Sequence, residues 1–180
     1  MAGHAAPAEM GLLESARAVL DAGVLEPAAD FGREPQAVAF ARQADRGAVM
    51  FLLRRATGDW MAIIALLERR DGAWYEVTLV HKPWWDPAEA FADDELMATG
   101  GHSRFATGSA PEIVLIPGQA APDTSIERAD VSSDDEINVH PPWGHFIYLG
   151  ERDRSDQTVK LTARRAGREQ TAAFEPIGER

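Results

Sequence analysis

Three consecutive apolar runs separated by short polar turns constrain the fold of this chain more than any other feature. The runs cover residues 48–55, 60–68 and 73–81. The last two are joined through Asp71-Gly72. An Asp-Gly pair between apolar runs indicates a two-residue hairpin, because a type I′ turn needs positive φ angles that these residues tolerate. Together with a short strand expected at 36–42, the pattern predicts an antiparallel β-meander.

Two of these runs contain apolar residues at consecutive positions, 49–53 and 61–67, instead of alternating with polar ones. Uninterrupted apolar runs are typical of strands that are buried on both faces. We therefore expect a second sheet over one face of the meander and a helix over the other. A helix at 60–69 is the alternative, because Met, Ala, Leu and Glu favour helices, but the flanking hairpin signals favour a strand.

The helix is expected at 9–22, near the N-terminus. Its apolar residues recur at helical spacing, at Leu12, Leu13, Ala16, Val19 and Leu20. Gly23 can end the helix in the left-handed conformation, with Val24 placed for the packing contact of a Schellman motif. Proline and glycine residues then predict a connector. Residues 1–35 thus form a tail, a helix and a connector, and a β domain follows at 36–175.

An insertion at 83–111 interrupts the strands after the meander, which covers 36–82. The sequence from Asp86 to Glu89 is typical of a helix start, with Asp86 as the N-cap and Pro87 in the first turn. The insertion is therefore expected to contain a short helix.

The closing segment, 112–174, returns to short strands separated by turns. They are expected at 113–116, 124–131, 137–140, 145–149, 158–164 and 169–174. Alternation is clearest near the end of the segment, where Val159, Leu161 and Ala163 are expected to point inward. Arg165-Ala166-Gly167 is expected to form the last turn. Several short strands at this spacing are typical of a β-sandwich.

Three stretches of the closing segment carry a resemblance to a known fold. They are Trp143 to Ile147, Val159 to Ala163 and Gly167 to Glu169. Through them the closing third of the chain resembles immunoglobulin-like β-sandwich modules of bacterial proteins. The resemblance implies a mainly β chain built as an antiparallel sandwich, here with an N-terminal helix and a short helical insertion. It transfers no catalytic residue, and it leaves open whether the meander and the closing strands form one unit or two.

The charge balance restricts the partners of this protein. The sequence has 18 basic and 29 acidic residues, a net charge of −11, so nucleic acid is not an expected ligand. The absence of cysteine excludes disulfides and thiolate nucleophiles. No apolar run is long enough to cross a bilayer and no signal-peptide pattern begins the chain, so a soluble, cytoplasmic protein without membrane contact is expected.

No motif of a known catalytic chemistry is present, and the aromatic residues form the clearest candidate site. Trp84, Trp85 and Trp143 lie in proline-rich stretches, and tryptophan on loops is typical of interfaces and stacking sites. His102 lies in the same insertion as the first pair. These four residues are the expected contacts of a protein or small ligand, although the tryptophans could instead close the ends of the core.

An alternative site is a metal centre around the turn at 140–145. His140 and His145 flank this turn and Asp135 precedes it, and imidazole with carboxylate suits Zn²⁺ in a hydrolytic site. The alternative interpretation is a proline-rich turn between two strands. His81 is expected at the core or its rim, in phase with Tyr75 and Leu79.

Two functions follow from these candidate sites. The first is a non-catalytic binding protein without a cofactor, which binds a protein, a small ligand or a second copy of itself through a strand edge. The second is a metal-assisted hydrolase.

Overall fold

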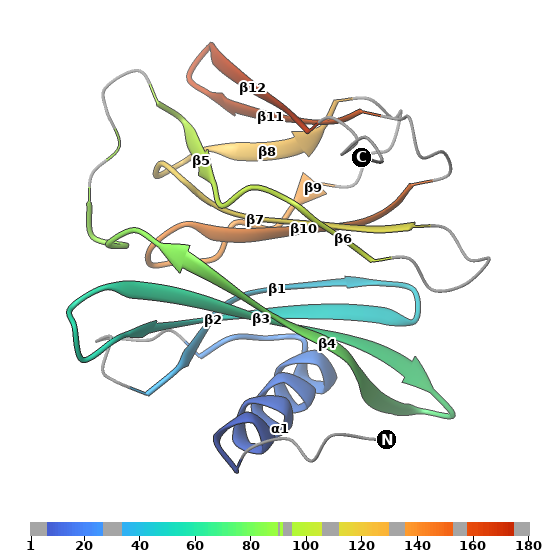
Figure 1. Ribbon diagram of the computed structural model, residues 1–180. Helices are drawn as coiled ribbons and strands as arrows, with labels where there is room; N and C mark the ends of the chain where they lie inside the picture. Colours follow the sequence, from blue (N-terminus) through green and yellow to red (C-terminus); the bar gives the residue numbers. More distant parts are fainter. Residues whose placement is uncertain are drawn as a thin grey trace, which may run out of the picture. The chain divides into compact units, whose positions relative to one another are not determined.

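The computed structural model describes residues 7–26, 34–89, 91, 95–105, 112–129, 136–152 and 158–174. In this part the chain is mainly β, with one helix and three antiparallel sheets (Figure 1). The expected mainly β class is thereby confirmed. The chain divides into two compact units, Met1–Asp86 and Pro87–Arg180. The described part contains no helix long and apolar enough to cross a membrane.

The first unit is a helix followed by a four-stranded meander. Its elements are α1 (Pro7–Ala22), β1 (Gln36–Gln43), β2 (Arg46–Arg54), β3 (Trp60–Arg70) and β4 (Ala73–Trp84), with the strands in the order β1-β2-β3-β4. Strand β3 pairs along its length with β2, so the alternative of a helix at 60–69 is wrong. The type I′ hairpin is confirmed, because Asp71 and Gly72 have φ angles of 50° and 82°.

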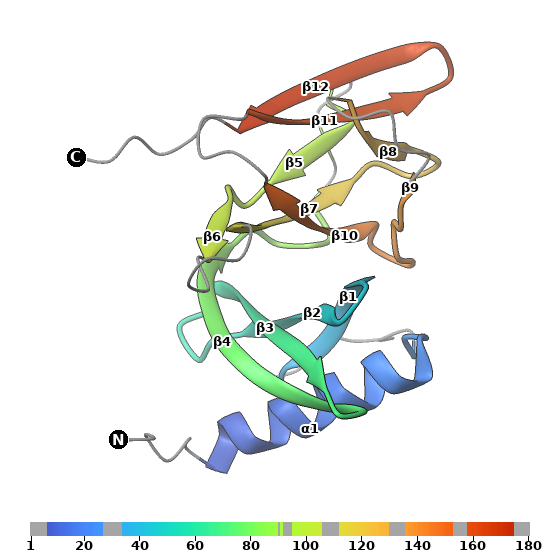
Figure 2. The same cartoon turned by 90° about the vertical axis from the view of Figure 1, so that its right-hand side faces the viewer.

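Helix α1 lies along one face of this sheet (Figure 2). Its apolar side chains pack with those of alternate residues on β2 and β3, namely Val49, Phe51, Ile63, Ala65 and Leu67. The intervening side chains point to the opposite face and are also buried, as with Met50, Leu52, Ile64 and Leu66. Burial on both faces explains why these runs do not alternate with polar residues.

Two expectations for the first unit are wrong in detail. Gly23 ends α1 with a φ of 69°, and its N–H donates to Val19 O at 2.8 Å, but Val24 is 64% exposed, so most of its side chain is not packed. His81 is exposed on the edge strand β4, although it lies opposite Ile63 and in phase with Leu79 as expected. Tyr75 is out of phase with Leu79, because a β-bulge opposite Leu66 and Leu67 changes which side chains of β4 face the core. As a result Trp74 and Leu79, an odd number of residues apart, pack in the same helix-covered core.

The second unit consists of two four-stranded sheets that share one core (Figure 2). One sheet contains β5 (Met97–Thr99), β6 (Ser103–Phe105), β7 (Glu112–Ala120) and β10 (His145–Arg152). The other contains β8 (Ser125–Arg128), β9 (Glu136–Ile137), β11 (Val159–Arg165) and β12 (Arg168–Phe174). Val159, Leu161 and Ala163 point into the core as expected, and Ala166-Gly167 forms the final turn with positive φ at both residues.

The expected helix in the insertion is wrong for the described residues of 83–111, which contain β5 and β6 instead. Met97 enters the core, and the backbone of β5 pairs with the edge of β7, which satisfies its hydrogen bonds. The Gln170 side chain completes this pairing: its Oε1 accepts from the N–H groups of Leu96 and Met97 at 2.6 and 3.0 Å. Residues 90, 92–94 and 106–111 lie outside the described part.

Gly47 is expected to control how closely α1 approaches the meander. A Cβ atom at this position would lie 2.6 Å from Leu20 Cδ2, and Leu20 is fully buried, so Gly47→Ala would separate the helix from β2. We expect a loss of about 1–3 kcal/mol in the free energy of unfolding, measured by urea denaturation. Gly11→Ala is the matched control, because its Cβ meets no atom within 4 Å and alanine favours the helix, which should raise stability. Equal effects of the two variants would contradict this account.

Candidate functional site

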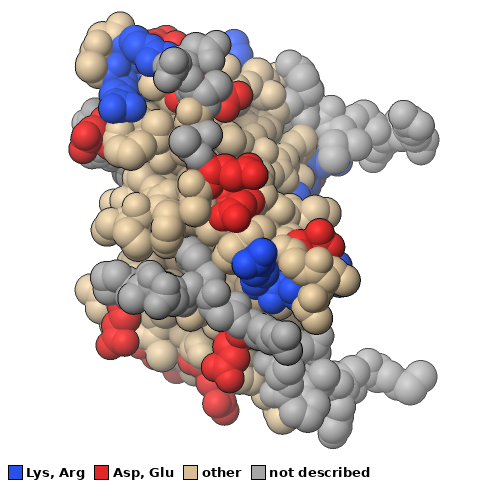
Figure 3. Space-filling view, turned by 90° about the vertical axis from the view of Figure 1, so that its left-hand side faces the viewer, with Lys and Arg blue, Asp and Glu red and all other residues tan. Residues whose placement is uncertain are grey.

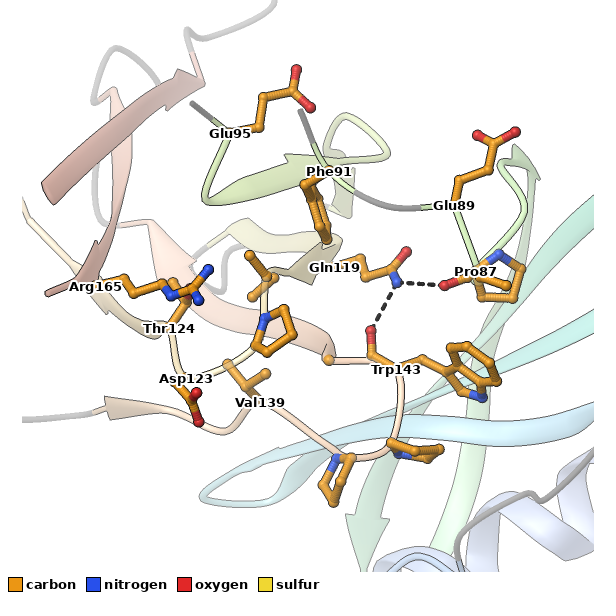
Figure 4. A pocket seen from close by; sticks show the side chains of 17 residues that line it. Pro87, Glu89, Phe91, Glu95, Gln119, Asp123, Thr124, Val139, Trp143 and Arg165 are labelled. Carbon is orange, nitrogen blue, oxygen red and sulfur yellow. Dashed lines mark hydrogen bonds between the residues drawn. The ribbon is translucent and has the colours of Figure 1, made fainter. Parts of the chain in front are cut away.

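The second unit contains a pocket of about 750 Å³ (Figure 4). Three stretches that are separate in sequence line it: residues from 87 to 95, residues 119–124, and the turn at 141–144. Val139 and Arg165 complete the lining. The pocket therefore brings together the insertion and the proline-rich turn, the two segments that interrupt the strands.

Gln119 holds these segments together. It lies near the end of β7 and is only 3% exposed. Its Nε2 donates to Pro87 O at 2.9 Å and to Trp143 O at 2.8 Å, as the dashed lines in Figure 4 show. One amide thus satisfies a carbonyl from each side of the pocket, which makes the pocket a preformed feature of the fold.

The turn at 140–145 is held by backbone hydrogen bonds. The His140 N–H donates to His145 O at 2.8 Å, and the Gly144 N–H donates to His140 O at 2.9 Å. The Ala120 N–H donates to Gly144 O at 2.8 Å, which fastens the turn to the end of β7. Gly144 has a φ of 73°, and a Cβ there would lie 2.3 Å from Ala120 O. Only glycine fits this position without moving the backbone.

The pocket wall combines apolar surface with a few polar groups. Proline, valine and aromatic side chains supply most of the apolar wall, from Phe91, Pro122, Val139, Pro141 and Pro142. Glu89 and Glu95 carry their carboxylates away from the pocket floor, as Figure 4 shows. Thr124 is only 7% exposed, and its Oγ1 is buried without a hydrogen-bond partner in the part of the chain that the structure describes.

The residues expected to contact a ligand do not all line this pocket. Trp143 does. Trp84 and Trp85 belong to the first unit, where their rings stack with centroids 4.0 Å apart; Trp84 is a buried residue at the end of β4 rather than a loop residue. His102 lies in the second unit and packs edge-on against Phe174, with ring centroids 5.8 Å apart.

The histidines of the alternative metal site flank the turn as neighbours. His140 and His145 form an isolated bridge, and His145 is 1% exposed. Burial, together with the charge that His140 can carry, lowers the pKa of His145 to about 3. Within the described ranges no three histidine or acidic side chains are grouped to hold a metal ion, and Asp135 lies outside those ranges. The metal site therefore stays a prediction.

On the face shown in Figure 3, the described Lys and Arg side chains within each unit form small groups rather than a continuous stripe. A protein that binds nucleic acid through phosphate contacts presents such a stripe. The pattern on this face agrees with the net charge of −11.

Gln119, Thr124 and Arg165 are functional candidates that sequence reasoning missed. Gln119 had one available signal, because it is the only polar side chain in the stretch from Ile113 to Ala121. Thr124 and Arg165 have no comparable signal, since their importance depends on strands that meet only in the folded unit.

No family model matches the chain, and neither the curated proteins nor the solved structures contain a match. The site is therefore interpreted from its own geometry.

The buried imidazole of His145 should make the second unit sensitive to acid. Its folded-state pKa of about 3 lies below the ordinary value of 6.5, so the unfolded chain binds the proton first as the pH falls. Stability is retained above pH 6.5 and lost below it, with a slope that approaches about 1.4 kcal/mol per pH unit. His145→Gln should remove this slope between pH 6.5 and 5, measured by urea unfolding at each pH. His81→Gln, at an exposed histidine, should keep it; the same slope in all three proteins would refute the assignment.

Gln119→Leu should loosen the pocket. The substitution leaves the carbonyls of Pro87 and Trp143 without the Nε2 donor, so we expect a loss of about 1–3 kcal/mol in the free energy of unfolding. Hydrogen exchange of the 141–144 turn should accelerate as well. Gln43→Leu, at an exposed position of β1, is the control and should change neither measurement. Unchanged exchange at the turn in Gln119→Leu would contradict the role of this amide.

Proposed function

We propose that this protein is a non-catalytic binding protein that takes a small molecule into the pocket of the second unit, with an immunoglobulin-like β-sandwich as the scaffold. The observation that carries the proposal is the preformed pocket that Gln119 holds together. A volume of about 750 Å³ lies within the range of small-molecule sites, and mostly apolar walls with a few placed polar groups are their usual composition.

The chemistry of the lining favours binding over catalysis. The described lining residues include no histidine and no cysteine, the commonest general base and a common nucleophile. Thr124 is the one hydroxyl among them, and its Oγ1 has no described base within hydrogen-bond distance. An activated nucleophile needs such a base. The arrangement therefore supports recognition of a ligand rather than its chemical conversion.

The proposal is tested by filling the pocket. A fragment library is screened against the full chain by saturation-transfer NMR, and hits are repeated with Ala88→Trp, which places an indole at an exposed lining position. We expect at least one fragment class whose affinity falls about tenfold or more in this variant, because the ring occupies the ligand's volume. Ala129→Trp, at an exposed residue of the second unit that is not among the described lining residues, is the matched control. Fragments that bind both variants equally, or no hits at all, would overturn the proposal.

A further inference from the structure

The most informative group in the pocket is the hydroxyl of Thr124. A buried polar atom without a partner is uncommon in folded proteins and costs about 1–3 kcal/mol. The Thr124 Oγ1 is such an atom, in a residue that lines the pocket wall. A ligand atom placed against this wall would supply the missing hydrogen bond.

Arg165 stands beside this hydroxyl. Strands β8 and β11 pair in an antiparallel register that ends with Ser125 opposite Arg164. Thr124 precedes β8 by one residue and Arg165 follows Arg164, so the register extended by one step brings these two residues opposite each other. Directly opposed residues of antiparallel strands direct their side chains to the same side, at a Cβ separation of about 5 Å. Figure 4 shows the Arg165 side chain extending toward Thr124, and both line the pocket.

Arg165 forms no ion pair within the described part of the structure, in contrast to its neighbour Arg164. Arg164 makes ion pairs with Glu127 and Glu169, and these acidic partners raise its pKa. No ion pair joins Arg165 to any described carboxylate, including that of Asp123, although both residues line the same pocket. Arg164 and Arg165 are thus consecutive residues of β11, of which Arg164 is paired with carboxylates, whereas Arg165 is not paired with a described carboxylate and borders the pocket.

The remaining charges of the lining limit what kind of anion could bind. Three carboxylates, of Glu89, Glu95 and Asp123, belong to the lining together with the single guanidinium of Arg165, although those of Glu89 and Glu95 point away from the pocket floor. A phosphate or another multiply charged anion would be repelled by this excess of negative charge. A single negative charge, placed directly on the guanidinium and the hydroxyl, satisfies both donors and meets about half the repulsion that a dianion meets. The apolar wall then accommodates the rest of the molecule.

We propose that the ligand of this pocket is an apolar monocarboxylate, whose carboxylate accepts hydrogen bonds from Thr124 Oγ1 and the Arg165 guanidinium while its body contacts Phe91, Pro122 and Val139. This inference rests on the proposed function and names the chemical class of its ligand.

The test compares ligands that share a phenyl ring and differ in charge. The probes are 3-phenylpropionate, its neutral amide 3-phenylpropanamide, the cation 3-phenylpropylamine and the dianion phenyl phosphate, each titrated into the full chain by NMR. We expect the carboxylate to bind about tenfold more tightly than the amide, because a charge-assisted hydrogen bond is about twice as strong as a neutral one. The amine and the phosphate should bind more weakly than the carboxylate.

Three variants assign the binding to the proposed groups. Arg165→Gln should lower the affinity for 3-phenylpropionate about tenfold and leave that for the amide nearly unchanged. Thr124→Val, which keeps the shape and removes the hydroxyl, should lower it severalfold. Arg164→Gln is the matched control, because this guanidinium is occupied by Glu127 and Glu169, and it should have no effect on binding.

The failures of the two proposals are distinguishable. Equal binding of the acid and the amide, tighter binding of the amine or the phosphate, or a loss in Arg164→Gln equal to that in Arg165→Gln would overturn the monocarboxylate. The monocarboxylate proposal also fails if no carboxylate binds while other fragments still lose affinity in Ala88→Trp. In that case the pocket remains a binding site. If no compound is affected by Ala88→Trp, both proposals fall.

Discussion

The backbone pairing of β7 is the constraint on which the second unit depends. One edge of this strand pairs with β10 along eight residue positions, from Glu112 to Gln119, and the other edge carries both β5 and β6. Gly118 permits close packing near the end of the strand, since a Cβ there would lie 2.3 Å from Phe146 Cζ and 2.8 Å from Ala98 O. Thr124 lies in the short connection between β7 and β8, whereas Gln119 lies in this strand, so the sheet sets its position. Sites supported in this way are held more rigidly than sites on loops.

The pocket shows how a largely apolar unit accommodates polar groups. Gln119 is buried and supplies hydrogen bonds to backbone carbonyls, which is how interiors usually satisfy such a group. Gln170 does the same for the start of β5, where its side chain both accepts and donates. Thr124 differs from both because its hydroxyl is buried without a described partner. This difference separates residues that stabilise the fold from the one that we assign to ligand recognition.

Whether a prediction from the sequence was confirmed depended on whether its physical cause lies in neighbouring residues or in tertiary contacts. The Asp71-Gly72 hairpin and the final Ala166-Gly167 turn depend on the φ angles of two adjacent residues, so they could be predicted. The insertion was expected to be helical from a good N-terminal signal at Asp86, yet Met97 pairs with β7 and enters the core. Tertiary pairing overrode a local preference there, as it did at the β-bulge that puts Tyr75 out of phase with Leu79. Of the tryptophans expected to contact a ligand, Trp143 lines the pocket, whereas Trp84 and Trp85 lie in the other unit.

The sequence by itself determined the mainly β class, the order and approximate bounds of most strands, the N-terminal helix and the acidic charge. These depend on the spacing of apolar residues and on turn chemistry, which act over a few neighbouring positions. Only the tertiary structure could bring Thr124 and Arg165 into one pocket lining and join residue 87 to residue 143 through one glutamine side chain. Such proximities arise from the register between distant strands, and no local pattern encodes that register.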